Sequence, residues 1–237
     1  MLDLQDLDAK ADQLRHQRSH LPELAEIEQL STSRTDLDNG ARDAQIVVDD
    51  LTEEQSKIDA DVEQGRTRRT RDQERVDQGV ISNPKDLQRM LSELESLQRR
   101  ITTLEDQELE VMEQVETAQQ ELDSLTSQVA AADERLTTLS ESRNEKTGAL
   151  DRELNAVAAE RTPIAAGLPA DLLALYEKLR AQKGGVGAAP LRARQCGGCR
   201  LSLDPLELAS IKAAGSDEVI RCEECQRILV RIAESGL

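Results

Sequence analysis

Four cysteines in two C-x-x-C pairs are the residues of this sequence best suited to chemistry. Cys196 and Cys199 form the first pair, and Cys222 and Cys225 form the second after twenty-two intervening residues. Each pair places two thiolates on one tight turn, and two such turns brought together give a closed tetrahedral set of sulfur ligands. The spacing therefore predicts one structural zinc ion with no coordination position left for a substrate.

Two other states of these cysteines have to be weighed. A rubredoxin-like iron site uses similar spacing, but the chain has no Trp, no Phe and one Tyr with which to shield it. Disulfides form mainly in oxidising compartments. The N-terminus shows no signal peptide, and no run of about 18 apolar residues is present. We therefore expect a cytoplasmic chain that binds zinc and does not enter a membrane.

No other group of residues suggests catalysis. His16 and His20 lie four residues apart, but no third metal ligand accompanies them, so a solvated helix face explains them. The glycine-rich stretch Gly184-Gly-Val-Gly187 follows a predicted helix and precedes no clear one, which is the wrong context for a phosphate-binding loop. No Ser/His/Asp or Cys/His nucleophile set is apparent. We predict that the protein is not an enzyme.

Basic residues gather in two places, although the net charge of −17 opposes non-specific binding to nucleic acid or anionic membranes. The first group is Arg66, Arg68, Arg69, Arg71 and Arg75, with Lys85 and Arg89 across a predicted turn. The second group, around the cysteines, is Arg192, Arg194, Arg200, Arg221, Arg227 and Arg231. Either group is a solvated surface balanced by nearby acids, or a docking patch for an acidic partner or a phosphate backbone. With almost no aromatic residues for base stacking, DNA or RNA binding would rest on arginines and fall steeply with salt.

Apolar residues recur at alternating steps of three and four through most of the first 140 residues. One series comprises Leu87, Met90, Leu94, Leu97, Ile101, Leu104, Glu108, Val111, Val115, Ala118, Leu122, Leu125, Val129, Ala132, Leu136 and Leu139. An earlier series comprises Ile27, Leu30, Arg34, Leu37, Ala41, Ala44, Val48, Leu51, Gln55, Ile58, Val62 and Gly65. This 3.5-residue period is typical of coiled-coil seams.

A short break separates the two series. Gly79 can end one helix, Ser82 or Asn83 can cap the next, and Pro84 suits its first position. The equal arms 2–78 and 84–160 predict an antiparallel hairpin, with Pro22 interrupting the first arm. If the arms pair about residue 81, Leu51 lies opposite the region of Val111. Pairing of the arms between two chains is the alternative, so both monomer and dimer stay open.

The sequence thus predicts a mainly α protein, a long antiparallel coiled-coil hairpin followed by a small C-terminal zinc-ribbon domain. We expect the hairpin over residues 1–160 with its turn near 79–83, a linker and short helix over 161–195, and the zinc ribbon over 196–237. Fewer than fifty residues are too few for a stable core alone, so the metal should supply much of the ribbon's folding free energy.

These features resemble the bacterial family of coiled-coil hairpin proteins with a C-terminal four-cysteine zinc ribbon, which includes flagellar and type III secretion regulators of the FlgZ/CdsZ kind. The resemblance spans the chain and rests on Asn83-Pro-Lys-Asp-Leu-Gln88, Arg99-Arg100, Leu172-x-x-Leu-Tyr176 and both cysteine pairs. It implies an adaptor that binds protein partners of the transcription or secretion machinery, and RNA in some members. Val230 stands where the family often has an aromatic residue.

Two functions follow as hypotheses. The first is a regulatory zinc-binding scaffold that binds protein partners and nucleic acid, with Lys85, Arg194, Arg200 and Arg227 among the candidate contacts. The second is a factor that enters the RNA polymerase secondary channel, like the DksA and Gre proteins, which also present a coiled-coil hairpin. Those factors act through acidic residues at the tip, whereas residues 66–89 here carry seven basic and four acidic side chains.

Overall fold

The computed structural model describes residues 1–237 and divides into two compact units. Unit 1 comprises Met1–Ala25 with Leu139–Leu237, and unit 2 comprises Glu26–Thr138. The helices are α1 (Leu2–Ser19), α2 (Pro22–Asp77), α3 (Pro84–Ala166), α4 (Ala170–Gln182) and α5 (Pro205–Ala213). The strands are β1 (Ala188–Arg192), β2 (Gln195–Cys196) and β3 (Ile228–Arg231), and a 3-10 turn η1 (Ala233–Ser235) follows.

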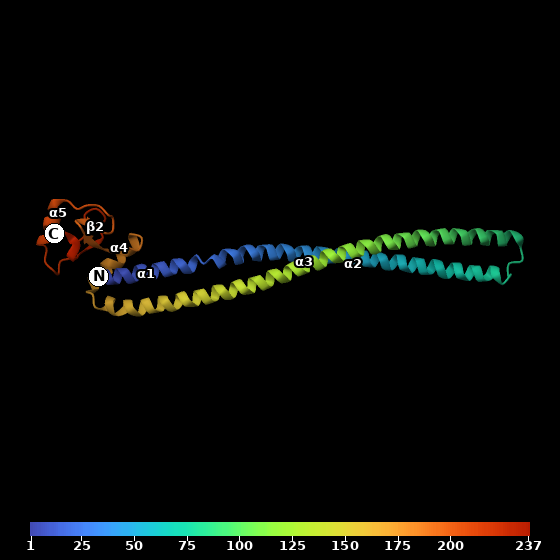
Figure 1. The fold of residues 1–237 in the computed structure, drawn as a ribbon, viewed down its shortest axis with the longest axis horizontal. Helices are drawn as coiled ribbons and strands as arrows, with labels where there is room; N and C mark the ends of the chain where they lie inside the picture. The colour runs from blue at the N-terminus through green and yellow to red at the C-terminus, as the bar shows by residue number, and fades with distance from the viewer. The chain divides into compact units, whose positions relative to one another are not determined.

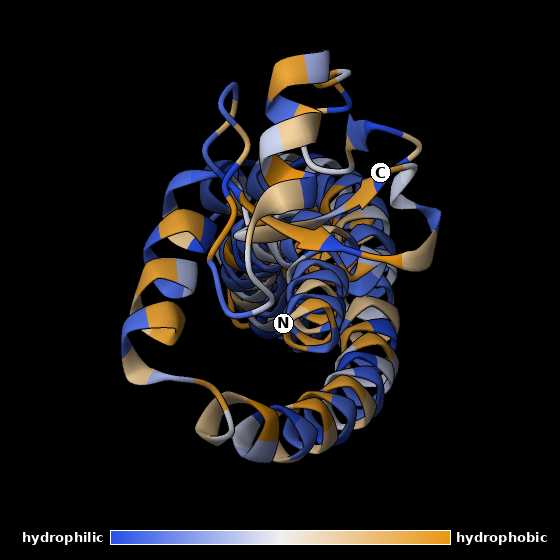
Figure 2. Cartoon of the chain, turned by 90° about the vertical axis from the view of Figure 1, so that its left-hand side faces the viewer, coloured by the Kyte–Doolittle hydropathy of each residue, from blue (hydrophilic) through white to orange (hydrophobic).

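Unit 2 is the antiparallel coiled coil that the apolar period predicts. In this unit α2 and α3 lie side by side and are joined by one turn (Figure 1). Every residue of the two predicted seam series is buried or half-buried, whereas most flanking positions are exposed. Hydrophobic and hydrophilic residues accordingly alternate around the long helices (Figure 2). The predicted seam is therefore confirmed, including its polar members.

The turn between α2 and α3 is built as its residue types suggest. Gly79 has a φ of 61°, the left-handed conformation that glycine adopts without strain. The Asn83 side chain accepts a hydrogen bond of 2.9 Å from the backbone N–H of Lys85, and Pro84 is the first residue of α3. These contacts explain why the first helix ends at Asp77 and the second begins seven residues later.

The register of the two helices differs from the expected one by about one helical turn. A Cβ atom built on Gly40 would lie 3.7 Å from a methyl group of Leu125, and one built on Gly65 would lie 3.0 Å from Cγ1 of Ile101. These contacts centre the pairing near residue 83 and place Leu51 opposite Val115, not Val111. The expected centre at residue 81 assumed two arms that pair symmetrically about the break, whereas the helix contacts centre the pairing near residue 83.

Unit 1 begins with α1 packed against the end of α3. Ala11 and Leu14 of α1 contact Val157 of α3 in a small buried cluster. The predicted interruption at Pro22 is present, because α1 ends at Ser19 and α2 starts at Pro22. The helix α3 continues to Ala166, so Pro163 lies in its last turns, where the missing N–H removes a single hydrogen bond.

The segment expected as a linker with one short helix is more ordered than its composition suggests. It contains the end of α3, the whole of α4 and the strand β1. In the sheet, β1 is central, antiparallel to β2 and parallel to β3. Pairing of Ala188 with Ile228 and of Leu191 with Arg231 joins this segment to the residues after the last cysteine. The folded ribbon thus begins before Cys196.

Candidate metal centre

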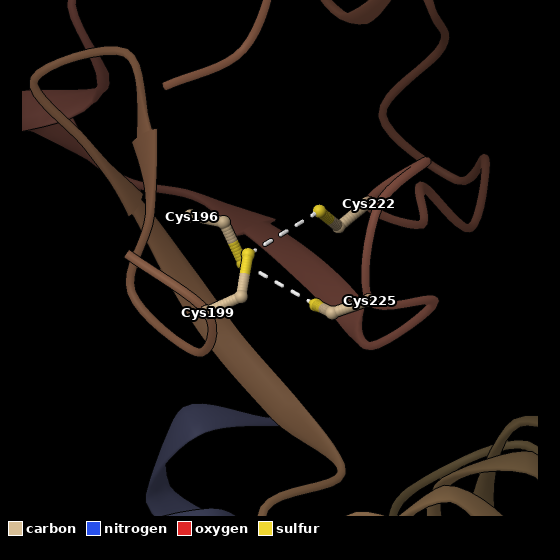
Figure 3. A group of neighbouring side chains, drawn as sticks. All are labelled: Cys196, Cys199, Cys222 and Cys225. Carbon is tan, nitrogen blue, oxygen red and sulfur yellow. Dashed lines mark hydrogen bonds between the residues drawn. The ribbon is translucent and has the colours of Figure 1, made fainter. Parts of the chain in front are cut away.

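The four cysteines converge from two turns of unit 1 (Figure 3). Cys196 ends β2, Cys199 follows three residues later, and Cys222 and Cys225 lie on the turn before β3. All four Sγ atoms lie within 4.8 Å of one another. Two of the residues, Cys196 and Cys222, are fully buried, while their partners are partly exposed. One buried and one partly exposed sulfur per turn therefore face a common centre.

The two cysteine turns repeat one backbone pattern. In the first, the N–H of Cys196 donates to the carbonyl of Leu201, and the N–H of Arg200 donates to the carbonyl of Cys196. In the second, the N–H of Cys222 donates to the carbonyl of Arg227, and the N–H of Gln226 donates to the carbonyl of Cys222. The residue after the second cysteine is left-handed in both turns, with φ values of 65° and 63°. The two halves of the site are therefore equivalent in structure despite their different sequences.

The sulfur positions fit a tetrahedral zinc ion. Zinc–sulfur bonds of about 2.3 Å in a tetrahedron separate the sulfurs by about 3.8 Å. The Sγ atoms of Cys196 and Cys225 are 3.7 Å apart, and those of Cys199 and Cys222 are 3.9 Å apart. A disulfide would need about 2.05 Å. The predicted ligand set is thus assembled, and it holds one structural zinc.

The thiols of this site differ in how readily they ionise. Burial raises the pKa of Cys222 to about 12, although N–H groups of Glu224 and Cys225 point toward its sulfur. Burial also opposes ionisation of Cys225, but hydrogen bonds from Arg227 and from the thiols of Cys222 and Cys199 together outweigh it and lower the pKa to about 7. Zinc binds thiolates, so binding of the ion releases protons from this set. Four thiolate ligands fill a zinc coordination sphere and leave no position for a substrate.

An apolar core surrounds the two buried cysteines. Its members are Ala189, Leu191, Leu203, Ile211 and Leu229, together with Cys196 and Cys222. The helix α5 closes this core. The Asp204 carboxylate caps the N-terminus of α5 by accepting hydrogen bonds of 2.7 and 2.8 Å from the N–H groups of Leu206 and Glu207. The metal ligands are therefore part of the hydrophobic core of the ribbon.

A buried polar network beside the ribbon was not apparent from the sequence. The Tyr176 hydroxyl donates a 2.8 Å hydrogen bond to Asp8, and Arg161 donates one of 2.7 Å to the same carboxylate. Burial alone would raise the pKa of Asp8, but these hydrogen bonds and the charge of Arg180 lower it. Tyr176 is completely buried and its own pKa is raised, first by burial and then by Asp8.

Gln5 explains why the glycine-rich stretch is ordered. Its side-chain amide donates 2.9 Å to the carbonyl of Gly185 and accepts 2.8 Å from the N–H of Gly187. A Cβ atom on Gly187 would approach the Tyr176 carbonyl to 2.6 Å, so the close packing requires glycine there. The stretch is a structural connection, which agrees with its interpretation as a linker in place of a phosphate loop.

The ribbon arginines divide into those used internally and those left at the surface. Arg227 donates to the carbonyls of Val186 and Lys183 at 2.9 Å each, and Arg231 donates to carbonyls at the end of α5. Arg194 donates to the Gly236 carbonyl, although the residue is exposed. Arg192 and Arg200 are exposed and make no side-chain hydrogen bond or ion pair. The internal contacts give Arg227 a structural role that competes with the predicted surface contact.

The arginines before the turn of unit 2 are mostly paired with acids. Arg66 pairs with Glu63 and Glu105 at 3.0 and 2.7 Å. Arg68, Arg71 and Arg75 surround Asp72, whose side chain is 7% exposed, at 3.7 to 3.9 Å. The candidates without an ion pair within 4.0 Å are Arg69 and Lys85, and beyond them Arg99 and Arg100 share this property. The predicted group is thus split by the acids that its helices bring close.

A pair of carboxylates interrupts the seam of unit 2. Glu108 occupies a seam position, and burial there together with the neighbouring charge of Asp59 raises its pKa, while Arg66 partly offsets this. One oxygen of Asp59 is buried without a hydrogen-bond partner. These residues are therefore a local weakness of the seam.

None of the helices combines the length and the apolar content that crossing a lipid bilayer requires.

Comparison with known proteins agrees with both parts of the fold. Residues 4–184 match the family of the CT398-like coiled coil hairpin domain, and residues 195–229 match the C4-type zinc ribbon domain. A relative in Mycobacterium tuberculosis, named Uncharacterized protein Rv2229c, is 35% identical over 98% of this chain and 94% of its own length.

Solved structures extend this agreement. A protein from Mycobacterium smegmatis has a TM-score of 0.83 at 33% identity, covering 97% of this chain and 95% of the other. CT398 from Chlamydia trachomatis has a TM-score of 0.70 at 19% identity, covering 98% and 95%, and shows the fold alone. Because the hairpin family matches more than half of the chain and the zinc-ribbon match follows it, this chain belongs to the CT398-like coiled-coil hairpin family and carries a C4-type zinc ribbon.

Proposed function

We propose that this protein is a non-enzymatic adaptor of the cytoplasm. In this proposal the zinc ion stabilises the fold of the ribbon, and the turn region of unit 2, residues 69–100, binds a protein partner. The observation that carries this proposal is the distribution of unpaired positive charge. Of the thirteen basic residues in unit 2, nine lie within 4.0 Å of a carboxylate, and the other four are Arg69, Lys85, Arg99 and Arg100. All four therefore lie within thirty-two residues around the turn.

The chemistry of the metal site supports the non-enzymatic part of the proposal. Four thiolates complete a zinc coordination sphere, so the metal offers no Lewis-acid position to a substrate. In the buried polar network, Asp8 accepts hydrogen bonds from Tyr176 and Arg161, and the Nε of Arg180 beside them is buried without a hydrogen-bond partner. Chemistry at either place would require opening the core, whereas binding at the turn region of unit 2 requires no rearrangement.

The narrower likeness to regulators of the FlgZ/CdsZ kind is part of this proposal, as is a partner from transcription or secretion machinery. Nucleic acid is a second ligand class, with exposed Arg192, Arg194 and Arg200 as its contacts in the ribbon. A polymerase secondary-channel role of the DksA or Gre type depends on acidic tip residues. Here Asp86 is paired with Arg89 at 3.7 Å, and no observation favours that role over the adaptor.

Photo-crosslinking in cells tests the proposal. A photoreactive residue replaces exposed Gln88 near the turn, exposed Gln119 in the middle of α3, or exposed Glu224 in the ribbon. We expect discrete protein adducts from position 88. Positions 119 and 224 should give few protein adducts. Adducts to RNA alone, or protein adducts only from position 224, would contradict an adaptor that binds through the turn region of unit 2.

A further inference from the structure

One groove of unit 2 combines two of the unpaired arginines with exposed aliphatic surface. Arg69 of α2 and Arg99 of α3 both line it. The other lining residues are Gln73, Leu91, Leu94, Glu95 and Gln98. The groove measures about 600 Å³ and is open to solvent. Its volume is in the range of ligand sites, but its open form suits an extended or helical segment better than an enclosed small molecule.

The floor of the groove is aliphatic. Leu94 is a buried seam residue, and Leu91 stands beside the seam with 45% of its surface exposed. An isolated exposed leucine is ordinary on a protein surface. Leu91 differs because it adjoins Leu94 within a groove, so a partner side chain placed there would contact both residues and leave water.

The charge of the groove selects an acidic partner. Arg69 and Arg99 come from opposite helices, and neither has a carboxylate of this chain within 4.0 Å. Glu95 is the single acid among the lining residues. Guanidinium groups bind carboxylates in bidentate geometry, and partly enclosed pairs gain more than exposed ones.

Phosphate backbones match this groove less well than carboxylates on an apolar face do. The groove holds no aromatic side chain on which a base could stack, and Glu95 would repel a phosphate. The exposed leucine would gain nothing from a sugar–phosphate chain, whereas it would bury an aliphatic side chain of a peptide.

We propose that this groove binds an acidic amphipathic helix of a protein partner, with an aliphatic side chain on Leu91 and carboxylates on Arg69 and Arg99. The register places Arg69 opposite residues 96 and 97 of α3, so Leu91 lies five or six residues from the level of Arg69 and eight residues from Arg99. Eight residues of helix span about 12 Å. The partner helix therefore carries its anchoring aliphatic residue five to eight positions from its acidic residues.

A displayed library of helical peptides, selected on the full-length protein, tests this chemistry without knowledge of the natural partner. We expect enriched peptides to be acidic and to carry an aliphatic residue five to eight positions from their acidic residues. Fluorescence anisotropy on an enriched peptide should show at least tenfold weaker binding to the Arg69→Glu/Arg99→Glu variant. The Arg69→Gln/Arg99→Gln variant, which adds no repulsion, should show an intermediate loss.

Two matched controls separate the groove from general electrostatics. Arg42→Glu/Lys57→Glu changes the net charge equally and replaces two exposed residues of α2 outside the groove, so its binding should change less than twofold. Leu91→Gln should weaken binding at least fivefold, whereas Leu109→Gln, which replaces a leucine 60% exposed outside the groove, should not. Circular dichroism of each variant verifies that the helices persist.

The inference rests on the proposed adaptor function, and the two fail in different ways. Enriched peptides without the acidic pattern, or unchanged affinity of the arginine variants, would overturn the groove. So would binding of a single-stranded uridine 20-mer in place of any peptide. Protein adducts from position 88 that persist in the Arg69→Glu/Arg99→Glu variant would keep the adaptor function and remove this groove from it.

Discussion

In unit 1, a tyrosine hydroxyl and a guanidinium converge on the buried carboxylate of Asp8, whereas in unit 2 a seam of aliphatic side chains receives Glu108 beside Asp59. The first carboxylate has three partners that favour its charged form, and its pKa is lowered. The second faces another acid, and its pKa is raised. Burial acts on both carboxylates in the same sense, so the neighbours decide the direction of each shift.

The two units also differ in how far their stabilising contacts reach along the chain. The ribbon core depends on one ion held by residues up to 29 positions apart, and the Asp8–Tyr176 hydrogen bond joins residues 168 positions apart. In unit 2 the same kind of aliphatic contact is repeated along both helices. Substitution of a few residues should therefore strongly destabilise unit 1, whereas unit 2 should tolerate most single substitutions.

Loss of the metal should have the largest effect. Cys222→Ser removes a buried ligand, and structural zinc supplies on the order of 10 kcal/mol of folding free energy. We expect one zinc per wild-type chain by elemental analysis, none in the variant, and loss of hydrogen-exchange protection in β1 and β3. The helical circular dichroism should mostly remain because the seam of unit 2 does not involve the metal.

The matched control for that experiment is Glu224→Gln, an exposed change in the same cysteine turn. It should keep the zinc and the protection of the strands. Melting of the entire helical signal in the serine variant would show that the coiled coil depends on the ribbon, which would remove the contrast between the units.

The buried network of unit 1 should give the next largest effect. Asp8→Asn keeps the shape but removes the buried one of the two carboxylates that pair with the Arg161 guanidinium, the other being Glu177, and the side chain of Arg161 is 28% exposed. We expect a loss of about 2 to 3 kcal/mol in the free energy of unfolding, measured in unit 1 by hydrogen exchange. The exposed neighbour Asp6, changed to Asn in the same helix, should cost little. An equal loss in both variants would mean that the network is not specifically stabilising.

The sequence was sufficient for features that are local or periodic. The cysteine spacing predicted the metal site, and the 3.5-residue period predicted the seam, because each pattern has few structural solutions. The period also placed Glu108 correctly at the seam, although the residue type argues against burial. The expected register of the two helices was wrong by about one helical turn. A period determines which face of each helix is buried, but it does not determine which residues of the two helices lie opposite each other.

Contacts across long separations were not readable from the sequence. Asp8 and Arg161 look like ordinary solvated charges in helices, and only folding brings them to Tyr176. The same holds for the arginines near the turn of unit 2, where Glu93 and Glu105 of α3 pair with Arg68 and Arg66 of α2. The left-handed residues Arg200 and Gln226 lack any residue-type signal, since glycine is the usual choice at such positions.

The pH dependence of the two carboxylates should differ in sign. The pKa of Asp8 is lowered by folding, so its contribution to stability is present above its unfolded value of about 3.9 and is lost as the pH falls through the folded pKa. The pKa of Glu108 is raised by folding, so its contribution is present below its unfolded value of about 4.3 and is lost as the pH rises through the folded pKa.

Glu108→Gln isolates the second effect. At pH 7 the substitution removes a charge that the seam and Asp59 disfavour, so the melting temperature of unit 2 should rise. The rise should disappear below pH 4, where the wild-type carboxyl is protonated. Thermal melts at the two pH values measure the difference, with exposed Glu110→Gln as the control. A lower melting temperature at pH 7 would mean that the carboxylate is stabilised in the seam.

The smallest effects are expected at two glycines within α2, and they test how closely the seam is packed. Glycine in a helix interior costs roughly 0.5 to 1 kcal/mol relative to alanine. A Cβ atom on Gly40 would meet Leu125 at 3.7 Å, an ordinary contact, so Gly40→Ala should stabilise unit 2 by about that amount. A Cβ atom on Gly65 would lie 3.0 Å from Cγ1 of Ile101, so Gly65→Ala must displace a side chain that is 3% exposed. The strain should cancel most or all of the gain.

Combining Gly65→Ala with Ile101→Ala makes room for the new methyl group, so the double variant should be more stable than the sum of the two single changes predicts. Denaturant unfolding of the four proteins measures this coupling, and strict additivity, or an equal gain at both glycines, would show that the helices separate freely at Gly65.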